Sequence, residues 1–151
     1  MSETIPLEML FSAAGTLALA AWLVLVLVPL RYRAPQYVAI AAAVLIAMLY
    51  AGLIGAFWTL GEGGFGSLAE VARLVAHPGL LLAGWVHYLA FDLAIGVWER
   101  DEARRIGLPQ WLLAPCLVLT FLLGPLGWLL FLAVRLFRLK IPAAAASPGG
   151  Q

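Results

Sequence analysis

The sequence predicts an all-α, polytopic membrane protein: a four-helix transmembrane bundle with a short interfacial helix. Of the 151 residues, 64% are hydrophobic and 11% charged, whereas a soluble domain is usually about half apolar and a quarter charged. The apolar residues form stretches long enough to cross a bilayer as helices, and segments rich in charge, glycine or proline separate them. We interpret residues 1–141 as a single transmembrane domain and residues 142–151 as a disordered tail.

The first two spans, at about residues 9–30 and 37–58, are expected to form an antiparallel hairpin. Arg31 and Tyr32 follow the first span as an interfacial anchor. Pro35 then disfavours helical backbone at the residue before it. A glycine-rich loop follows the second span, and Ser67 with Glu70 resembles a capping box. This pattern predicts a short interfacial helix over residues 68–76.

The third span, residues 80–98, carries His87 and Asp92 close to its midpoint. Nineteen helical residues cover roughly 28 Å, enough to cross the hydrocarbon core. A carboxylate at that depth costs on the order of 3 kcal/mol, so intramembrane acids usually mark function. The alternative is structural: Asp92 accepts hydrogen bonds from another helix, and His87 is a satisfied neutral imidazole.

The last apolar region, residues 111–137, would extend about 40 Å as one helix. Its Gly124-Pro125-Leu126-Gly127 segment predicts a kink, and we expect one kinked span. The alternative is a re-entrant hairpin that turns at residues 124–127. That alternative would place all the lysines and arginines except Arg73 on one side of the membrane.

The polar residues of the third span are the candidates for chemistry. Asp92 and His87 are five residues apart, so their side chains should diverge by about 140° around the helix. We predict that both act on a ligand buried in the bundle. Aromatic residues deep enough to stack on a flat or conjugated ligand are Trp85, Tyr88, Phe91 and Phe121; packing is their alternative role.

The charged segment that follows, residues 99–105, is expected to lie in water or among lipid headgroups. Its acids and arginines can pair there as a solvated network. Glu99 has a second interpretation, because it falls on the same helix face as Asp92 and would line the mouth of a pocket.

Several chemistries are excluded or disfavoured. No lysine lies within a span for a retinal Schiff base. The two histidines lie around one helix, so they cannot ligate haem from facing helices. A metal site from His87, Asp92, Glu99 and Cys116 lacks a diagnostic spacing. We therefore predict no cofactor and leave a metal ion there as an open alternative. A formal charge of +1 implies no nucleic-acid partner.

Two stretches together carry a family resemblance. His87-Tyr-Leu-Ala-Phe-Asp-Leu93 continues to Arg105, and Thr120-Phe-Leu-Leu-Gly-Pro-Leu-Gly127 has Arg135 downstream. In this order and hydrophobic setting, they resemble the ABA-deficient-four-like membrane proteins, a family whose plant member is required to make neoxanthin from violaxanthin. The resemblance implies a small membrane protein that binds or converts a carotenoid or related isoprenoid.

For such a conversion, the resemblance suggests Asp92 as acid and His87 as base or hydrogen-bond partner. Arg100 and Arg105 would anchor a hydroxylated end ring, and we add Gly124 and Pro125 to the ligand-binding set. Isomerisation and light- or oxygen-dependent cleavage are both open. The Ala-, Leu- and Arg-rich composition indicates a multi-pass protein of a bacterial inner membrane.

The expected partners are the lipid bilayer and the isoprenoid ligand, and a homo-oligomer is compatible with the sequence. Two rival functions also fit. One is a non-catalytic membrane scaffold or assembly factor, and the other is a small proton-coupled transporter in which Asp92 carries the proton.

Overall fold

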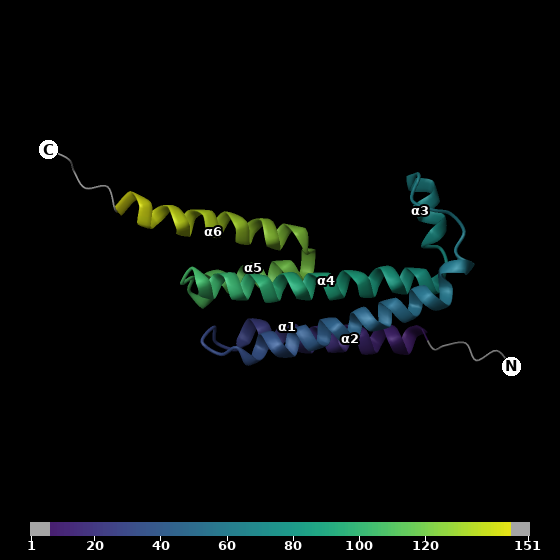
Figure 1. Ribbon diagram of the computed structural model, residues 1–151, viewed down its shortest axis with the longest axis horizontal. Helices are drawn as coiled ribbons and strands as arrows, with labels where there is room; N and C mark the ends of the chain where they lie inside the picture. The colour runs from purple at the N-terminus through teal and green to yellow at the C-terminus, as the bar shows by residue number, and fades with distance from the viewer. Residues whose placement is uncertain (1–6, 146–151) are drawn as a thin grey trace.

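The computed structural model describes residues 7–145, which form helices and no strand. Three helices, α1 (Leu7–Leu27), α2 (Ala34–Phe57) and α4 (Pro78–Arg105), pack side by side as an antiparallel bundle (Figure 1). Within the described residues, these three are long and apolar enough to cross a membrane. The 3-10 turn η1 (Trp58–Leu60) and the short helix α3 (Leu68–Leu74) lie at one end. The predicted all-α membrane architecture is thereby confirmed, and so are the first three of the four predicted spans.

Small residues allow the three long helices to approach closely. The buried alanines of α1 and α2 are Ala14, Ala18, Ala21, Ala39 and Ala42. Lipid tails are as apolar as the helix surface, so close van der Waals packing between such residues stabilises a membrane bundle. Gly96 of α4 serves the same purpose, because a Cβ atom there would lie 2.5 Å from the ring of Trp22.

The predicted helix signals around α3 are present. The Ser67 side-chain oxygen accepts a hydrogen bond from the Glu70 N–H at 3.2 Å, and the Glu70 carboxylate accepts one from the Gly66 N–H at 3.0 Å. The α3 helix ends at Leu74, two residues before the predicted boundary. His77 then caps α4, since its Nδ1 accepts the N–H of Gly79.

The prediction of one kinked span over residues 111–137 is wrong. The region forms two helices, α5 (Gln110–Leu123) and α6 (Pro125–Ala145), and α6 runs back alongside α5 (Figure 1). The chain reverses at Gly124, whose φ of +44° favours glycine, and Pro125 has no N–H to continue α5. The alternative hairpin is therefore the one that forms. The α6 helix includes residues 142–145 of the expected tail, and residues 146–151 lie outside the described range.

The α5–α6 hairpin covers only part of the bundle. Fourteen residues of α5 extend about 21 Å, less than the roughly 30 Å of a hydrocarbon core. One core cluster joins α1, α4, α5 and α6 through residues such as Trp22, Leu93, Leu117 and Phe131. The other cluster contains residues of α1, α2 and α4 and none of the hairpin. The hairpin therefore turns near the middle of α4, where Gly124 meets Asp92.

The charged segment after the third span is not a solvated loop, which corrects the prediction. The α4 helix continues through Arg105, and Glu99 and Arg100 are fully buried. The pairing of its later residues is confirmed: Glu102 binds Arg105 at 2.6 Å and also pairs with Arg135 of α6. This burial arises because the α5–α6 hairpin and the α1–α2 turn pack against the last turns of α4.

Basic residues gather at this end of the molecule. The α1–α2 connection, the end of α4 and the second half of α6 hold Arg31, Arg33, Arg100, Arg104, Arg105, Arg135, Arg138 and Lys140. Only Arg73, in α3, lies at the opposite end. Such an asymmetry is typical of a cytoplasmic face.

Candidate functional site within the membrane

The α4 helix places Asp92 against the turn of the α5–α6 hairpin. The residue is 6% exposed. A Cβ atom added to Gly124 would lie 2.9 Å from its Oδ1, so only a glycine leaves room for the carboxyl group. The Oδ2 atom is buried and has no hydrogen-bond partner in the described part of the chain. Asp92 is thus buried against the hairpin turn.

Tyr88 lies one turn before Asp92 and closes the end of α5. Its hydroxyl donates a hydrogen bond of 3.4 Å to the Phe121 carbonyl. The last carbonyls of a helix need such partners, especially at a depth without water. The Phe121 ring contacts Trp22 with ring centres 5.7 Å apart. Tyr88 and Phe121 therefore fix the hairpin beside Asp92.

Glu99 lies two turns beyond Asp92 on the same face and is fully buried. The Thr120 Oγ1 lies 3.0 Å from its Oε1 and 3.2 Å from its Oε2. Thr120 of α5 thus contacts Glu99 of α4. We name this group the tip site and define it as Tyr88, Asp92, Glu99, Thr120 and Gly124.

His87 lies outside the tip site. Its ring packs against Tyr50 of α2 and Phe91, with centroid distances of 5.3 and 4.7 Å, and its side chain is exposed on the bundle surface. Asp92 faces the hairpin instead. The helical geometry predicted this divergence, and the structure does not bring the two residues together in one site.

His87 and Phe91 belong to a long groove between α2 and α4. Three cavities of about 310, 330 and 300 Å³ follow one another along α4. The second and third share Ile40, Ala94 and Val97. The first shares no lining residue with the second, and the packed rings of His87 and Phe91 lie between them. We call these cavities together the α2–α4 groove. It extends from Leu80 to Arg104, about 36 Å of helix rise.

The two ends of the α2–α4 groove are more polar than its middle. The middle is lined by aliphatic residues and Phe91. The end near the basic cluster is lined by polar and interfacial side chains: Arg33, Gln36, Tyr37, Trp98, Asp101 and Arg104. The opposite end is lined by His87, Tyr50, Trp58 and Phe65. The rings of Trp58 and Phe65 stack there, with their centroids 6.1 Å apart. The groove therefore suits a long apolar molecule with polar end groups.

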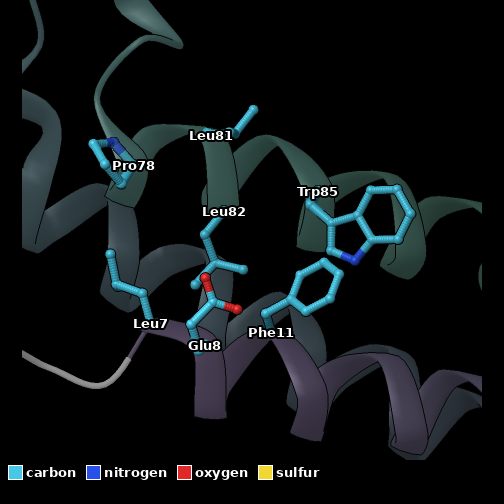
Figure 2. Close-up of a pocket in the computed structure, with 7 residues that line it drawn as sticks. All are labelled: Leu7, Glu8, Phe11, Pro78, Leu81, Leu82 and Trp85. Atoms are coloured by element: carbon cyan, nitrogen blue, oxygen red, sulfur yellow. The ribbon is translucent and has the colours of Figure 1, made fainter.

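Trp85 lines a separate cavity between the first turns of α1 and α4. Figure 2 shows this cavity of about 440 Å³, in which Phe11 and Trp85 lie beside each other and Glu8 points towards Leu82. The Trp85 ring also packs against Tyr88, with centroids 5.6 Å apart. Trp85 thus connects this cavity to Tyr88 of the tip site. The cavity lies at the end of the bundle that the hairpin does not cover.

The two arginines of the predicted ligand set make protein contacts. Arg100 donates to the carbonyls of Leu25 and Pro29 at 2.6 and 2.8 Å, where it closes the end of α1. Arg105 binds Glu102 in a two-bond arrangement. Pro125 is exposed at the start of α6. Among the described residues, no three His, Cys, Asp or Glu side chains converge as a metal site.

Sequence reasoning missed the contacts that close the tip site. Thr120 binds Glu99 across 21 residues, and Arg135 reaches Glu102 across 33. The Thr120–Glu99 pair follows from the turn between α4 and α5. The Arg135–Glu102 pair follows from the reversal at Gly124, for which the paired glycines around Pro125 were the sequence signal. Gly127 packs on the Thr120 backbone, where a Cβ atom would collide.

Three apolar spanning helices, a re-entrant hairpin and buried acids at its turn define a polytopic membrane protein. The sequence model of the ABA4-like family, described as ABA DEFICIENT 4-like, matches residues 9–131. The chain therefore belongs to the ABA4-like family, which confirms the resemblance seen in its motifs. No curated protein and no solved structure matches the chain significantly.

Proposed function

We propose that this chain binds a carotenoid or related isoprenoid along the α2–α4 groove and converts it within a bacterial inner membrane. The observation that carries the proposal is the groove itself. Its apolar middle lies between two polar ends, and about 36 Å of helix rise separates its limits. Family membership supports the choice of a carotenoid, given what the family's plant member is required for.

The groove offers different contacts to the middle and the ends of such a ligand. Phe91 is 61% exposed in the middle, where its ring can lie along a conjugated chain. At the basic end, Gln36 and Arg104 sit among donors and acceptors that suit a hydroxyl or keto group. Tyr50 and His87 give the other end a second polar pair.

His87 is the residue of the groove best suited to acid–base chemistry. A neutral imidazole can both donate and accept a proton, and it is cheap to place in the membrane compared with a charged group. Isomerisation needs no co-reactant and is the conversion we propose first. Oxidative cleavage would require dioxygen. Asp92 faces the hairpin, so it is not assigned to the same ligand-contacting group as His87.

The test is expression in a carotenoid-producing bacterium, followed by detergent extraction, absorption spectroscopy and chromatography of the pigments. We expect pigment to co-purify with the wild-type chain. Ala94→Trp should reduce the bound pigment at least tenfold, because Ala94 lines two of the three cavities. Ala20→Trp is the matched control, since Ala20 is exposed on α1 and lies outside the groove.

His87 separates binding from conversion. We expect His87→Phe to keep the bound pigment and to abolish any change in pigment profile that the wild type causes. Absence of pigment from the wild type, together with an unchanged profile, would refute the proposal and favour the scaffold function. Equal pigment loss in Ala94→Trp and Ala20→Trp would place the ligand elsewhere.

A further inference from the structure

Two acids of the tip site are buried and form no ion pair with the described residues. Asp92 and Glu99 are 6% and 0% exposed. The ion pairs in the described part of the chain involve Asp101 and Glu102, and neither Asp92 nor Glu99 takes part in one. An isolated ionised carboxylate at this depth costs several kcal/mol. Both side chains therefore favour a neutral form.

The elements that pack around the two acids add no compensating cation. On α4 the neighbouring titratable group is Tyr88, and on α5 it is Cys116, which is neutral as a thiol. At the hairpin turn Asp92 meets Gly124, and on α6 the nearest basic side chain, Arg135, binds Glu102. The spans α1 and α2 carry no Lys or Arg between residues 7 and 27 or between 34 and 57. Arg100 follows Glu99, yet it donates to the end of α1.

Thr120 is the side chain that contacts the Glu99 carboxyl group. Thr120 Oγ1 lies within hydrogen-bond distance of both carboxyl oxygens, at 3.0 and 3.2 Å. A hydroxyl has a single hydrogen to donate but two lone pairs to accept with. One hydroxyl thus faces both oxygens, and in the described part of the chain the hydrogen-bond partner of the Glu99 carboxyl group is this neutral group rather than a cation.

Asp92 is the more accessible of the two groups. Asp92 is 6% exposed and Glu99 0% exposed, and Asp92 lies next to the half-buried Tyr88 at the turn of the hairpin. Among the described residues, its buried Oδ2 has no hydrogen-bond partner. Beyond Tyr88 is Trp85, which lines the cavity in Figure 2. Glu99 is enclosed farther under the hairpin, which covers it completely.

We propose that Asp92 and Glu99 form a proton-binding site within the membrane, in which each carboxylate takes a proton from water and becomes a neutral carboxylic acid. This site is distinct from the α2–α4 groove and needs no bound pigment. Asp92 is its exchanging member and Glu99 its enclosed member.

The test is infrared spectroscopy of the pigment-free protein in phosphatidylcholine vesicles at pH 7, in H2O and in D2O. A protonated carboxyl group has a C=O stretching band that an ionised one lacks, and the band shifts in D2O. We expect the wild type to show this band, and Asp92→Asn and Glu99→Gln each to lose about half of it. Asp101→Asn is the matched control: its side chain is 67% exposed, so the band should not change.

Absence of the band from the wild type at pH 7 would overturn the proposal, even if a variant fails to fold. A band that persists undiminished in both Asp92→Asn and Glu99→Gln would also overturn it. A carboxylate band that shifts on addition of sodium chloride would show a cation site instead. Melting temperatures provide the fold control: Asn and Gln resemble the neutral acids, so both variants should melt within a few degrees of the wild type.

Discussion

The Asp92 carboxyl group lies directly against Gly124: a Cβ atom at that glycine would be 2.9 Å from Oδ1 and 3.1 Å from Oδ2. Gly124 also provides the reversal between α5 and α6 with its positive φ. One residue without a side chain therefore meets two demands. It turns the hairpin, and it leaves room for an acid at the turn.

Gly124→Ala should destabilise the protein in two ways: by straining the backbone at residue 124 and by crowding the Asp92 carboxyl group. At φ +44° and ψ −99°, outside the left-handed helical region, the backbone is strained by about 1–3 kcal/mol for a residue with a Cβ atom, and the contact with Asp92 adds about 1–3 kcal/mol. Thermal unfolding in detergent measures the sum. Gly107→Ala is the matched control, because Gly107 has a φ of +65° but open space around it. Equal losses in the two variants would contradict a tight contact at Asp92.

Arg100→Met should lower the stability on the order of 3 kcal/mol, because charged hydrogen bonds to the carbonyls of Leu25 and Pro29 are lost and the carbonyls are left without donors. The exposed Arg31 is the control: it lies 4.7 Å over the Tyr32 ring, a contact of about 0.5–1 kcal/mol. Urea or thermal unfolding in micelles compares the two. A smaller loss in Arg100→Met than in Arg31→Met would show that the α1 end does not depend on Arg100.

The Glu102–Arg135 pair should couple α4 to α6. In a double-mutant cycle with Glu102→Gln and Arg135→Gln, we expect an interaction energy of about 0.5–3 kcal/mol in the unfolding free energy. Combining Asp101→Asn with Arg135→Gln should give additive effects, because Asp101 binds Arg104 and Gln36. A zero coupling for the first pair would mean that this ion pair does not hold α6 against α4.

The basic end should face the cytoplasm, following the positive-inside rule. On a Cys116→Ala background, a membrane-impermeant maleimide should label Glu70→Cys in intact bacteria and should label Arg138→Cys only after permeabilisation. These two positions lie at opposite ends of the bundle. The reverse labelling pattern would invert the orientation.

Hydropathy and local signals predicted much of the fold. The three long spans, the Ser67 cap and the break near Gly124 all follow from local sequence, because each depends on residues close together in the chain. The choice between a kink and a reversal at Gly124 did not follow, because it depends on packing between α5 and α6. Gly127 against Thr120 is the contact that settles it.

The candidate site was predictable to a lesser degree. The position of Asp92 deep in a span was visible in the sequence, and helical geometry separated it from His87. The burial of Glu99 and Arg100 was not visible, because charged residues after a span usually meet water. Their partners, Thr120 and the end of α1, come from distant parts of the chain.

A hairpin that turns near the middle of α4 gives the molecule unequal cross-sections in the two leaflets. The basic half contains five helices, and the other half contains the three long ones. The protein is therefore wedge-shaped, and it takes up more area among the lipids on its basic side. Such a shape expands one monolayer relative to the other, so the protein should gather where the membrane curves with that monolayer on the convex surface. Its partition between flat and tubular vesicles measures that preference.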